Sequence, residues 1–143
     1  MIVVDTNVMV RLLVGGEGTA AAATLFERDP EWAGAPILMS ELRNVLLGFV
    51  RRGDLTAEQA TTRSDQAAAI LGDRLMLVTS ASVIEVALEC RLTAYDAEFV
   101  ALARTLAVGL VTLDGAILRG APDVAVSLTS LGGPAAGLQG HRP

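Results

Sequence analysis

The sequence predicts an α/β protein, a three-layer α/β/α sandwich whose parallel sheet has about five strands. Two observations lead to this fold class. Short apolar runs alternate with helical patterns along the chain, and parallel strands need such crossover helices. The runs also lack the polar alternation of a half-exposed sheet, which is typical of strands that helices cover on both faces.

Five apolar runs are the expected strands. The first run ends at Asp5 and the fourth is soon followed by Asp114, so an acidic residue comes after each of them. We expect the strands at residues 2–4, 37–39, 75–78, 110–112 and 124–126.

Helical patterns fill the segments between these runs. The clearest one extends from Leu42 to Val50, with apolar residues at i, i+3, i+4, i+7 and i+8, and Gly53 is its expected end. Thr56 and Gln59 predict a capping box at the start of a helix that reaches residue 71. Further helices are expected at 20–28, at the apolar stripe of Val83, Ile84, Ala87 and Leu88, and from Phe99 to Leu106.

The length and composition predict one globular domain. The chain has 143 residues, 52% of them hydrophobic, with a mean hydropathy of +0.49. That is too apolar for disorder, yet no run approaches the roughly 18 apolar residues of a membrane span. We expect one domain at residues 1–131 and a flexible Gly/Pro-rich tail at 132–143. The early Asp5 does not fit a secretory signal, so a cytoplasmic protein is expected.

The residue types that are scarce exclude several kinds of enzyme. All 11 basic residues are arginines, which excludes the lysine of P-loops and of Schiff bases. The single histidine, His141, lies in the expected tail, and Cys90 has no second cysteine with it. Histidine-based triads and zinc sites are therefore disfavoured. Carboxylate chemistry with a hard divalent cation remains.

The net charge of −5 limits how the protein could bind a nucleic acid. A negative protein repels a polyanion unless metal ions or a local arginine patch offset the field at the site. A function on nucleic acid is therefore expected only together with a metal or such a patch.

Four acidic residues stand at special places in the predicted fold. Asp5 and Asp114 follow the first and fourth strands, Glu41 lies in the first turn after the second, and Asp96 opens a helix. Sites in open parallel sheets form outside the carboxyl ends of the strands. If the first and fourth strands are neighbours, these acids converge. Close carboxylates repel one another unless a cation such as Mg²⁺ or Mn²⁺ joins them.

Each of these acids also has a structural explanation. Aspartate is a good helix N-cap, and an acid in a first helical turn complements the helix dipole. For one residue alone the capping explanation is the stronger, and for the four together it is weaker. Polar neighbours could support a site, namely Thr6, Asn7, Asn44 and Thr112, whereas Ser40 is expected only as a helix N-cap and Thr112 also suits a strand.

Segments around these acids resemble the PIN-domain family, and most of all its VapC-type toxin ribonucleases from toxin–antitoxin pairs. The resemblance is carried by residues 3–7, 40–46, 93–103 and 110–114, and it extends to about Leu128. It implies a sheet of order 3-2-1-4-5 and RNA cleavage that depends on Mg²⁺ or Mn²⁺. By position, Asp5, Glu41, Asp96 and Asp114 correspond to the family's catalytic, metal-binding acids, Thr112 to its strand hydroxyl and Asn7 to its polar residue. It also implies a homodimer and a cognate antitoxin.

The sequence departs from the family pattern at two points. Many relatives have a basic or polar residue after the last aspartate, where this chain has Gly115. The absence of lysine leaves RNA contacts to arginines, which equally fit solvated helix faces. The candidates are Arg11, Arg43, Arg51 and Arg52.

The function expected from the sequence is metal-dependent hydrolysis of RNA phosphodiester bonds. Asp5, Asp96 and Asp114 would hold the cation, and Glu41 would bind it through water or act as a base. Two alternatives stay open. A haloacid-dehalogenase-like phosphatase would explain Asp5 and Asp114 but lacks a second aspartate at Asn7 and any lysine. A catalytically degenerate PIN-like module would only bind a partner protein.

Overall fold

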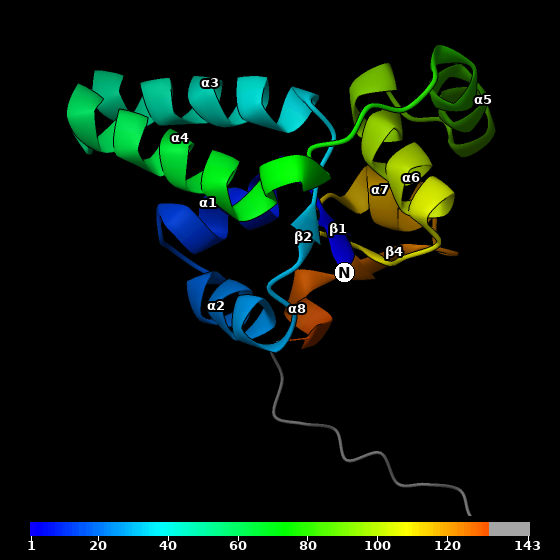
Figure 1. Cartoon of the computed structure of the whole chain (residues 1–143), viewed down its shortest axis with the longest axis horizontal. Coiled ribbons are helices and arrows are strands. Elements are labelled where there is room, and N and C mark those ends of the chain that lie inside the picture. The colour runs from blue at the N-terminus through cyan, green and yellow to red at the C-terminus, as the bar shows by residue number, and fades with distance from the viewer. Residues whose placement is uncertain (132–143) are drawn as a thin grey trace, which may run out of the picture.

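The computed structural model describes residues 1–131, and the predicted tail at 132–143 lies outside the described residues. Four parallel strands form one sheet in the order β2-β1-β3-β4 (Figure 1). They are β1 (Ile2–Val4), β2 (Trp32–Ala33), β3 (Leu110–Thr112) and β4 (Ala125–Ser127). The central pair is β1 and β3, so the expected neighbourhood of the first and fourth apolar runs is confirmed.

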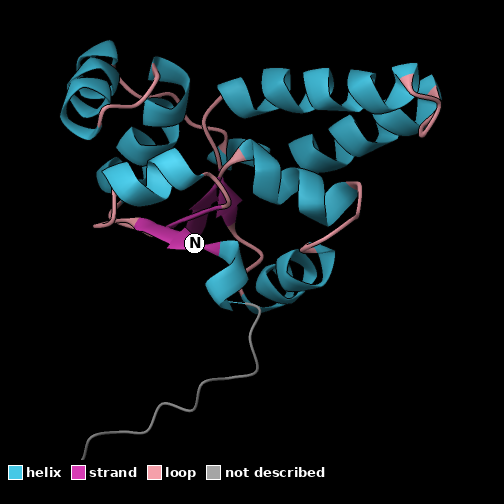
Figure 2. Ribbon diagram, turned by 180° about the vertical axis from the view of Figure 1, so that it is seen from behind, coloured by secondary structure: helices cyan, strands magenta, loops and turns pink. Residues whose placement is uncertain are grey.

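Helices flank the sheet on both sides. Figures 1 and 2 show α2 and α8 on one side and α5, α6 and α7 on the other, while α3 and α4 pack into a projecting hairpin. The predicted α/β class is therefore confirmed. The helices are α1 (Thr6–Leu13), α2 (Thr19–Arg28), α3 (Ile37–Arg51), α4 (Ala57–Leu71), the 3₁₀ turn η1 (Gly72–Arg74), α5 (Ser80–Cys90), α6 (Ala94–Leu106), α7 (Gly115–Gly120) and α8 (Leu128–Leu131).

Two of the five predicted strands are wrong. Residues 37–39 form the first turn of α3, and the strand beside β1 is instead Trp32–Ala33. A short apolar run fits a buried helix as well as a strand, and Leu38 and Leu42 both face the core. Residues 75–78 contribute only a single bridge, from Leu75 to Gly34, so a fifth strand is not seen within residues 1–131.

Helix α5 presents a different face to the core from the one that its sequence pattern predicts. The buried residues are Val83, Val86 and Cys90, whereas Ile84 is 59% exposed and Leu88 is 78% exposed. Both faces of this helix carry apolar residues, so periodicity alone does not choose between them. The predicted cap at Ser40 is also wrong, because α3 begins three residues earlier.

Other local predictions hold. Thr56 and Gln59 form the expected capping box at the start of α4, with both reciprocal hydrogen bonds present. Gly53 follows α3 with a φ of +80°, a backbone conformation that glycine adopts without strain. None of the helices within residues 1–131 combines the length and apolarity that crossing a lipid bilayer requires.

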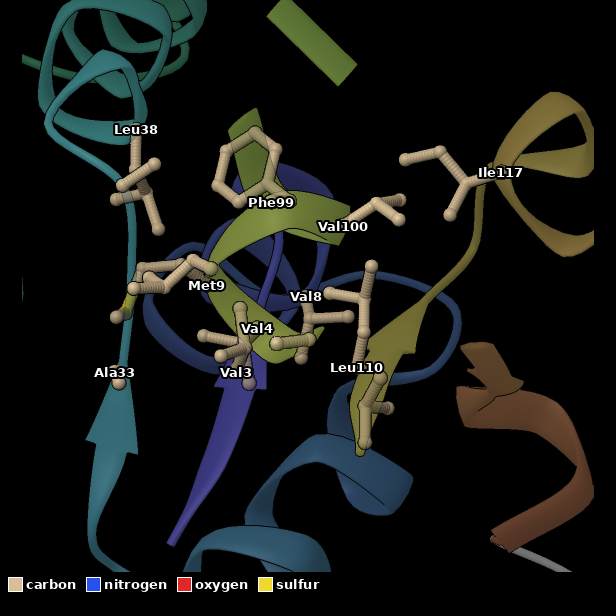
Figure 3. Close-up of a cluster of buried hydrophobic side chains, with 14 of the residues drawn as sticks. Val3, Val4, Val8, Met9, Ala33, Leu38, Phe99, Val100, Leu110 and Ile117 are labelled. Carbon is tan, nitrogen blue, oxygen red and sulfur yellow. The ribbon is translucent and has the colours of Figure 1, made fainter. Parts of the chain in front are cut away.

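The core lies between the central strands and the helices that cover them. Figure 3 shows side chains from β1, β3, α1 and α6 packed together. Burial of each such aliphatic side chain contributes about 1.5–3 kcal/mol. This packing fixes the carboxyl ends of β1 and β3 beside each other. The cluster includes Val3, Val4, Val8, Met9, Phe99, Val100 and Leu110, all at most 2% exposed.

Gly120 brings the end of α7 against the end of α5. A Cβ atom there would lie 2.6 Å from the carbonyl oxygen of Cys90. Because a backbone carbonyl cannot swing aside, we expect Gly120→Ala to lower the free energy of unfolding by about 1–3 kcal/mol in urea denaturation. Gly48→Ala is the control, since a Cβ inside α3 would meet only the flexible Arg52 guanidinium at 3.4 Å. Equal stability of both variants would contradict the close contact.

Candidate active site

A pocket of about 150 Å³ lies at the carboxyl ends of β1 and β3. All four acids that the sequence singles out line it, although they come from segments far apart in the chain. The capping explanation considered each acid separately and does not account for this convergence. The lining residues are Asp5, Thr6, Asn7, Glu41, Val45, Asp96, Phe99 and Asp114.

Asp5 is the most buried of the four acids, at 4% exposure. Its Oδ1 accepts a hydrogen bond from the Val8 backbone N–H at 3.1 Å, and its Oδ2 accepts one from the Thr112 hydroxyl. Burial raises the pKa of Asp5 from 3.8 to about 6, against the two hydrogen bonds, which lower it. The negative charges of Asp114 and Asp96 raise this pKa further, so Asp5 senses both neighbouring acids.

Thr112 connects the two central strand ends. It is fully buried, donates to Asp5 across the sheet, and accepts a hydrogen bond from the Asp114 backbone N–H at 2.9 Å. One hydroxyl group therefore fixes the first acid and the backbone of the last one. A β-branched residue chosen only for its strand propensity would not need these two bonds.

Asp114 acts as the N-cap of α7. Its Oδ1 accepts hydrogen bonds from the backbone N–H groups of Ala116 at 2.8 Å and Ile117 at 3.0 Å. Asp5 caps α1 in the same manner through Val8. Capping and a place in the pocket are therefore compatible, since Oδ2 of Asp114 accepts no hydrogen bond from residues 1–131.

Glu41 reaches the pocket from within a long helix. The sequence places it in the first turn after a strand, but it is the fifth residue of α3, which begins at Ile37. The Thr6 hydroxyl, 7% exposed, donates to its Oε1 at 2.9 Å. This bond links the start of α1 to α3 and fixes one oxygen of Glu41 at the pocket.

Asp96 lies in the first turn of α6, as the sequence predicts. The Thr93 hydroxyl caps the helix by accepting from the Asp96 backbone N–H at 3.2 Å. Burial raises the pKa of Asp96, and the charges of Asp114 and Glu41 raise it further. Two of the four acids thus carry the electrostatic signature of a pocket with uncompensated negative charge.

The predicted supporting residues differ in their positions. Asn7 is exposed and lines the pocket, whereas Asn44 is exposed on α3 and is not among the lining residues. Glu98 on α6 is an acid that the sequence did not single out, and its pKa is raised by burial and then by the charge of Glu41. Glu98 is two residues after Asp96, and residues at that spacing lie on different faces of a helix. The sequence pattern therefore does not select it.

The donor chemistry of the pocket fits a hard divalent cation. Carboxylate oxygens are the ligands that Mg²⁺ and Mn²⁺ prefer. A cation would offset both the burial of charge, which is the main cause of the raised pKa values of Asp5 and Asp96, and the smaller repulsion from neighbouring acids. Within residues 1–131, however, no three acidic, histidine or cysteine side chains stand close enough to hold a metal ion as they are arranged. Hydrogen bonds already engage both oxygens of Asp5 and Oε1 of Glu41.

A family model for the PIN domain matches residues 2–121. The chain belongs to the PIN-domain family. The match begins with β1 and extends past α7, so this PIN domain includes all four acids of the pocket. The family resemblance stated from the sequence is therefore confirmed.

Solved structures share the fold of this PIN domain. The structure of PAE2754 from Pyrobaculum aerophilum matches with a TM-score of 0.70 at 21% identity, covering 91% of this chain and 92% of that one. A toxin–antitoxin complex from Klebsiella pneumoniae matches with a TM-score of 0.66 at 20% identity, covering 90% and 98%. FitAcB from Neisseria gonorrhoeae matches with a TM-score of 0.64 at 20% identity, covering 89% and 96%. No curated protein gives a significant sequence match.

Proposed function

We propose that this PIN domain is a ribonuclease that uses Mg²⁺ or Mn²⁺ to hydrolyse RNA phosphodiester bonds, and that it is the toxin of a toxin–antitoxin pair. The observation that carries the proposal is the convergence of four acids in one pocket of a PIN domain. Asp5, Asp96 and Asp114 would hold the cation, with Glu41 acting through water. A bound divalent cation would lower the pKa of water and offset negative charge on the scissile phosphate.

The chain's own residues would prepare the reaction as follows. Thr112 and the Val8 N–H fix the Asp5 carboxylate, so its oxygens need no reorientation during the reaction. Thr112 is fully buried and donates its hydroxyl proton to Asp5, so it would act through this carboxylate rather than on the attacking water itself. Glu41, held by Thr6, would take a proton from the attacking water while the oxygen of that water bonds to phosphorus. The phosphorus–oxygen bond to the leaving ribose then breaks, and solvent protonates the leaving oxygen. Asn7 orients water at the pocket edge, and Asn44 supports Glu41 from outside.

The alternative with a specific observation in its favour is a degenerate PIN module that only binds protein. Within residues 1–131, no three acids stand close enough to share an ion. This arrangement is expected of a module that has no need to bind a metal. Metal uptake separates the two functions, because a binding module needs no cation. A haloacid-dehalogenase-like phosphatase is not favoured, since the chain belongs to another family.

The proposed activity is tested by metal removal. We expect the purified protein to cleave a labelled mixed-sequence RNA in Mn²⁺ or Mg²⁺ and to lose this activity in excess EDTA. Calorimetry without RNA should show uptake of Mn²⁺. Cleavage at an equal rate in EDTA would refute the metal role, and absence of both cleavage and uptake would support the degenerate module.

Partners follow from the same proposal. A homodimer and a cognate antitoxin would cover apolar side chains that this chain leaves exposed, among them Ile84 and Leu88 on α5 and Tyr95 on α6. The Klebsiella pneumoniae relative in fold is described as a toxin–antitoxin complex. An RNA substrate places the proposed toxin in the cytoplasm.

A further inference from the structure

A hollow of about 410 Å³ lies between the end of α5 and α7, separate from the acidic pocket. Figure 1 shows both helices on the same side of the sheet. The close approach of Gly120 to the Cys90 carbonyl oxygen holds the two walls together through backbone. The arginines on the two walls therefore project from a fixed frame. The hollow is lined by Glu89, Cys90, Arg91, Ala116, Arg119 and Gly120.

The guanidinium of Arg119 lies near the beginning of α7, although the residue belongs to the last turn. Its Nη1 is 2.9 Å from the position that a Cβ on Gly115 would occupy. Gly115 directly follows Asp114, an acid of the pocket. The side chain thus brings a positive charge back along the helix to the border of the pocket.

The opposite wall also ends at a pocket acid. Arg91 follows α5 in the left-handed conformation, with φ of 55°, and is exposed. Two residues later, Thr93 caps α6 through the backbone N–H of Asp96. The hollow and the acidic pocket share no lining residue, but their linings come within two residues of each other at the start of α7, at Ala116 and Asp114.

The hollow has positive charge available to a ligand. Its one acid, Glu89, pairs with Arg104 at 3.3 Å, and Arg104 also pairs with Asp123 at 3.0 Å. Neither Arg91 nor Arg119 has an ion pair with any acid of residues 1–131. Two guanidinium groups thus face an open hollow beside a negative pocket.

Two of the four arginines named from sequence alone are engaged elsewhere, and the other two, Arg43 and Arg51, are exposed on α3 and line neither the acidic pocket nor the hollow. Arg52 stacks on the Phe49 ring at 4.7 Å and pairs with Asp54 at 3.4 Å. Arg11 packs along the glycine turn, with Nη1 3.4 Å from the Cβ position of Gly16. Neither lines the acidic pocket or the hollow.

We propose that Arg91 and Arg119 bind a backbone phosphate of the RNA strand, next to the phosphate that is cleaved. The proposal rests on the ribonuclease function proposed above. Guanidinium groups bind phosphate oxygens through paired, charge-assisted hydrogen bonds. In a protein of net charge −5, such a local attraction would add to that of a bound cation in holding a polyanion beside an acidic pocket.

Binding to a short labelled mixed-sequence RNA in EDTA tests the proposal without cleavage. We expect Arg91→Gln and Arg119→Gln each to raise Kd by about fivefold or more, and the double variant to raise it further. The slope of log affinity against log salt should shrink by about 0.7 for each phosphate that the variant no longer neutralises. Ala116→Glu, which adds a negative charge to the hollow, should also weaken binding. Arg28→Gln is the matched control, because Arg28 is exposed on α2 away from the hollow.

The outcomes separate this proposal from the ribonuclease proposal. If wild type fails to bind RNA, or the double variant binds with the same Kd and salt slope as Arg28→Gln, the phosphate site is refuted. In Mn²⁺ the double variant should raise KM and leave kcat near the wild-type value. Weakened binding without any wild-type cleavage would leave the phosphate site standing and reject the nuclease. Normal cleavage with unchanged KM in the double variant would support the nuclease and reject the phosphate site.

Discussion

Asp96→Asn is expected to slow RNA cleavage by at least about a hundredfold while the protein stays folded. Asp96 lies in the first turn of α6 and would supply a carboxylate oxygen to the cation. The amide of asparagine keeps the shape of the side chain but lacks the charge that offsets a divalent cation. The rate should be measured on labelled RNA in Mn²⁺, and circular dichroism should show an unchanged fold.

The control for this change is Asp65→Asn. Asp65 is exposed on α4, outside the acidic pocket, so the variant removes the same charge and should cleave RNA at the wild-type rate. We expect Asp5→Asn to abolish cleavage as well. Cleavage that survives both Asp5→Asn and Asp96→Asn would reject the metal-binding role of these acids.

Asp5→Asn is expected to make the metal-free protein more stable at neutral pH, by up to about 3 kcal/mol. Burial raises the pKa of Asp5 from 3.8 to about 6. Between these two pH values, the folded protein therefore keeps a proton on Asp5 that the unfolded chain has already released. Stability is full below about pH 4, falls as pH rises toward 6, and stays reduced above it. Asparagine carries no charge at any pH, so the variant keeps the free energy of unfolding that wild type loses when Asp5 ionises.

The measurement is the free energy of unfolding in EDTA from pH 4 to pH 8, the range in which this titration acts. The difference between Asp5→Asn and wild type should grow between about pH 4 and 6 and then level off. Asp65→Asn should stay within about 0.5 kcal/mol of wild type. Millimolar Mn²⁺ should reverse the order, because only wild type gains stability from a bound cation. A lower stability of Asp5→Asn in EDTA would contradict the destabilising burial of this charge.

The sequence predicts the central part of the fold because its signals there are local. The apolar runs at 2–4 and 110–112 are β1 and β3 as expected. Strand β2 has only two residues, Trp32 and Ala33, too few to show a period, so the longer apolar run at 37–39 gives the stronger strand signal. Whether that run is strand or helix depends on the helix that follows it, and no local pattern decides this.

The acidic pocket is predictable for a similar reason. Asp5 and Asp114 each follow a strand and Asp96 begins a helix, so topology brings them to one edge of the sheet. The charge beside Asp114 is not predictable in this way. Gly115 follows it in sequence, and the guanidinium that lies there belongs to Arg119, through a long side chain that folds back along its helix.

The bond from Thr112 to Asp5 joins residues that are 107 positions apart. During synthesis, the amino-terminal half of the chain emerges from the ribosome long before its partner strand exists. Asp5 therefore lacks both the Thr112 hydroxyl and the neighbouring Asp114 until most of the domain has been translated. The acidic pocket is therefore incomplete in a nascent chain until β3 and Asp114 have been translated and have folded against β1.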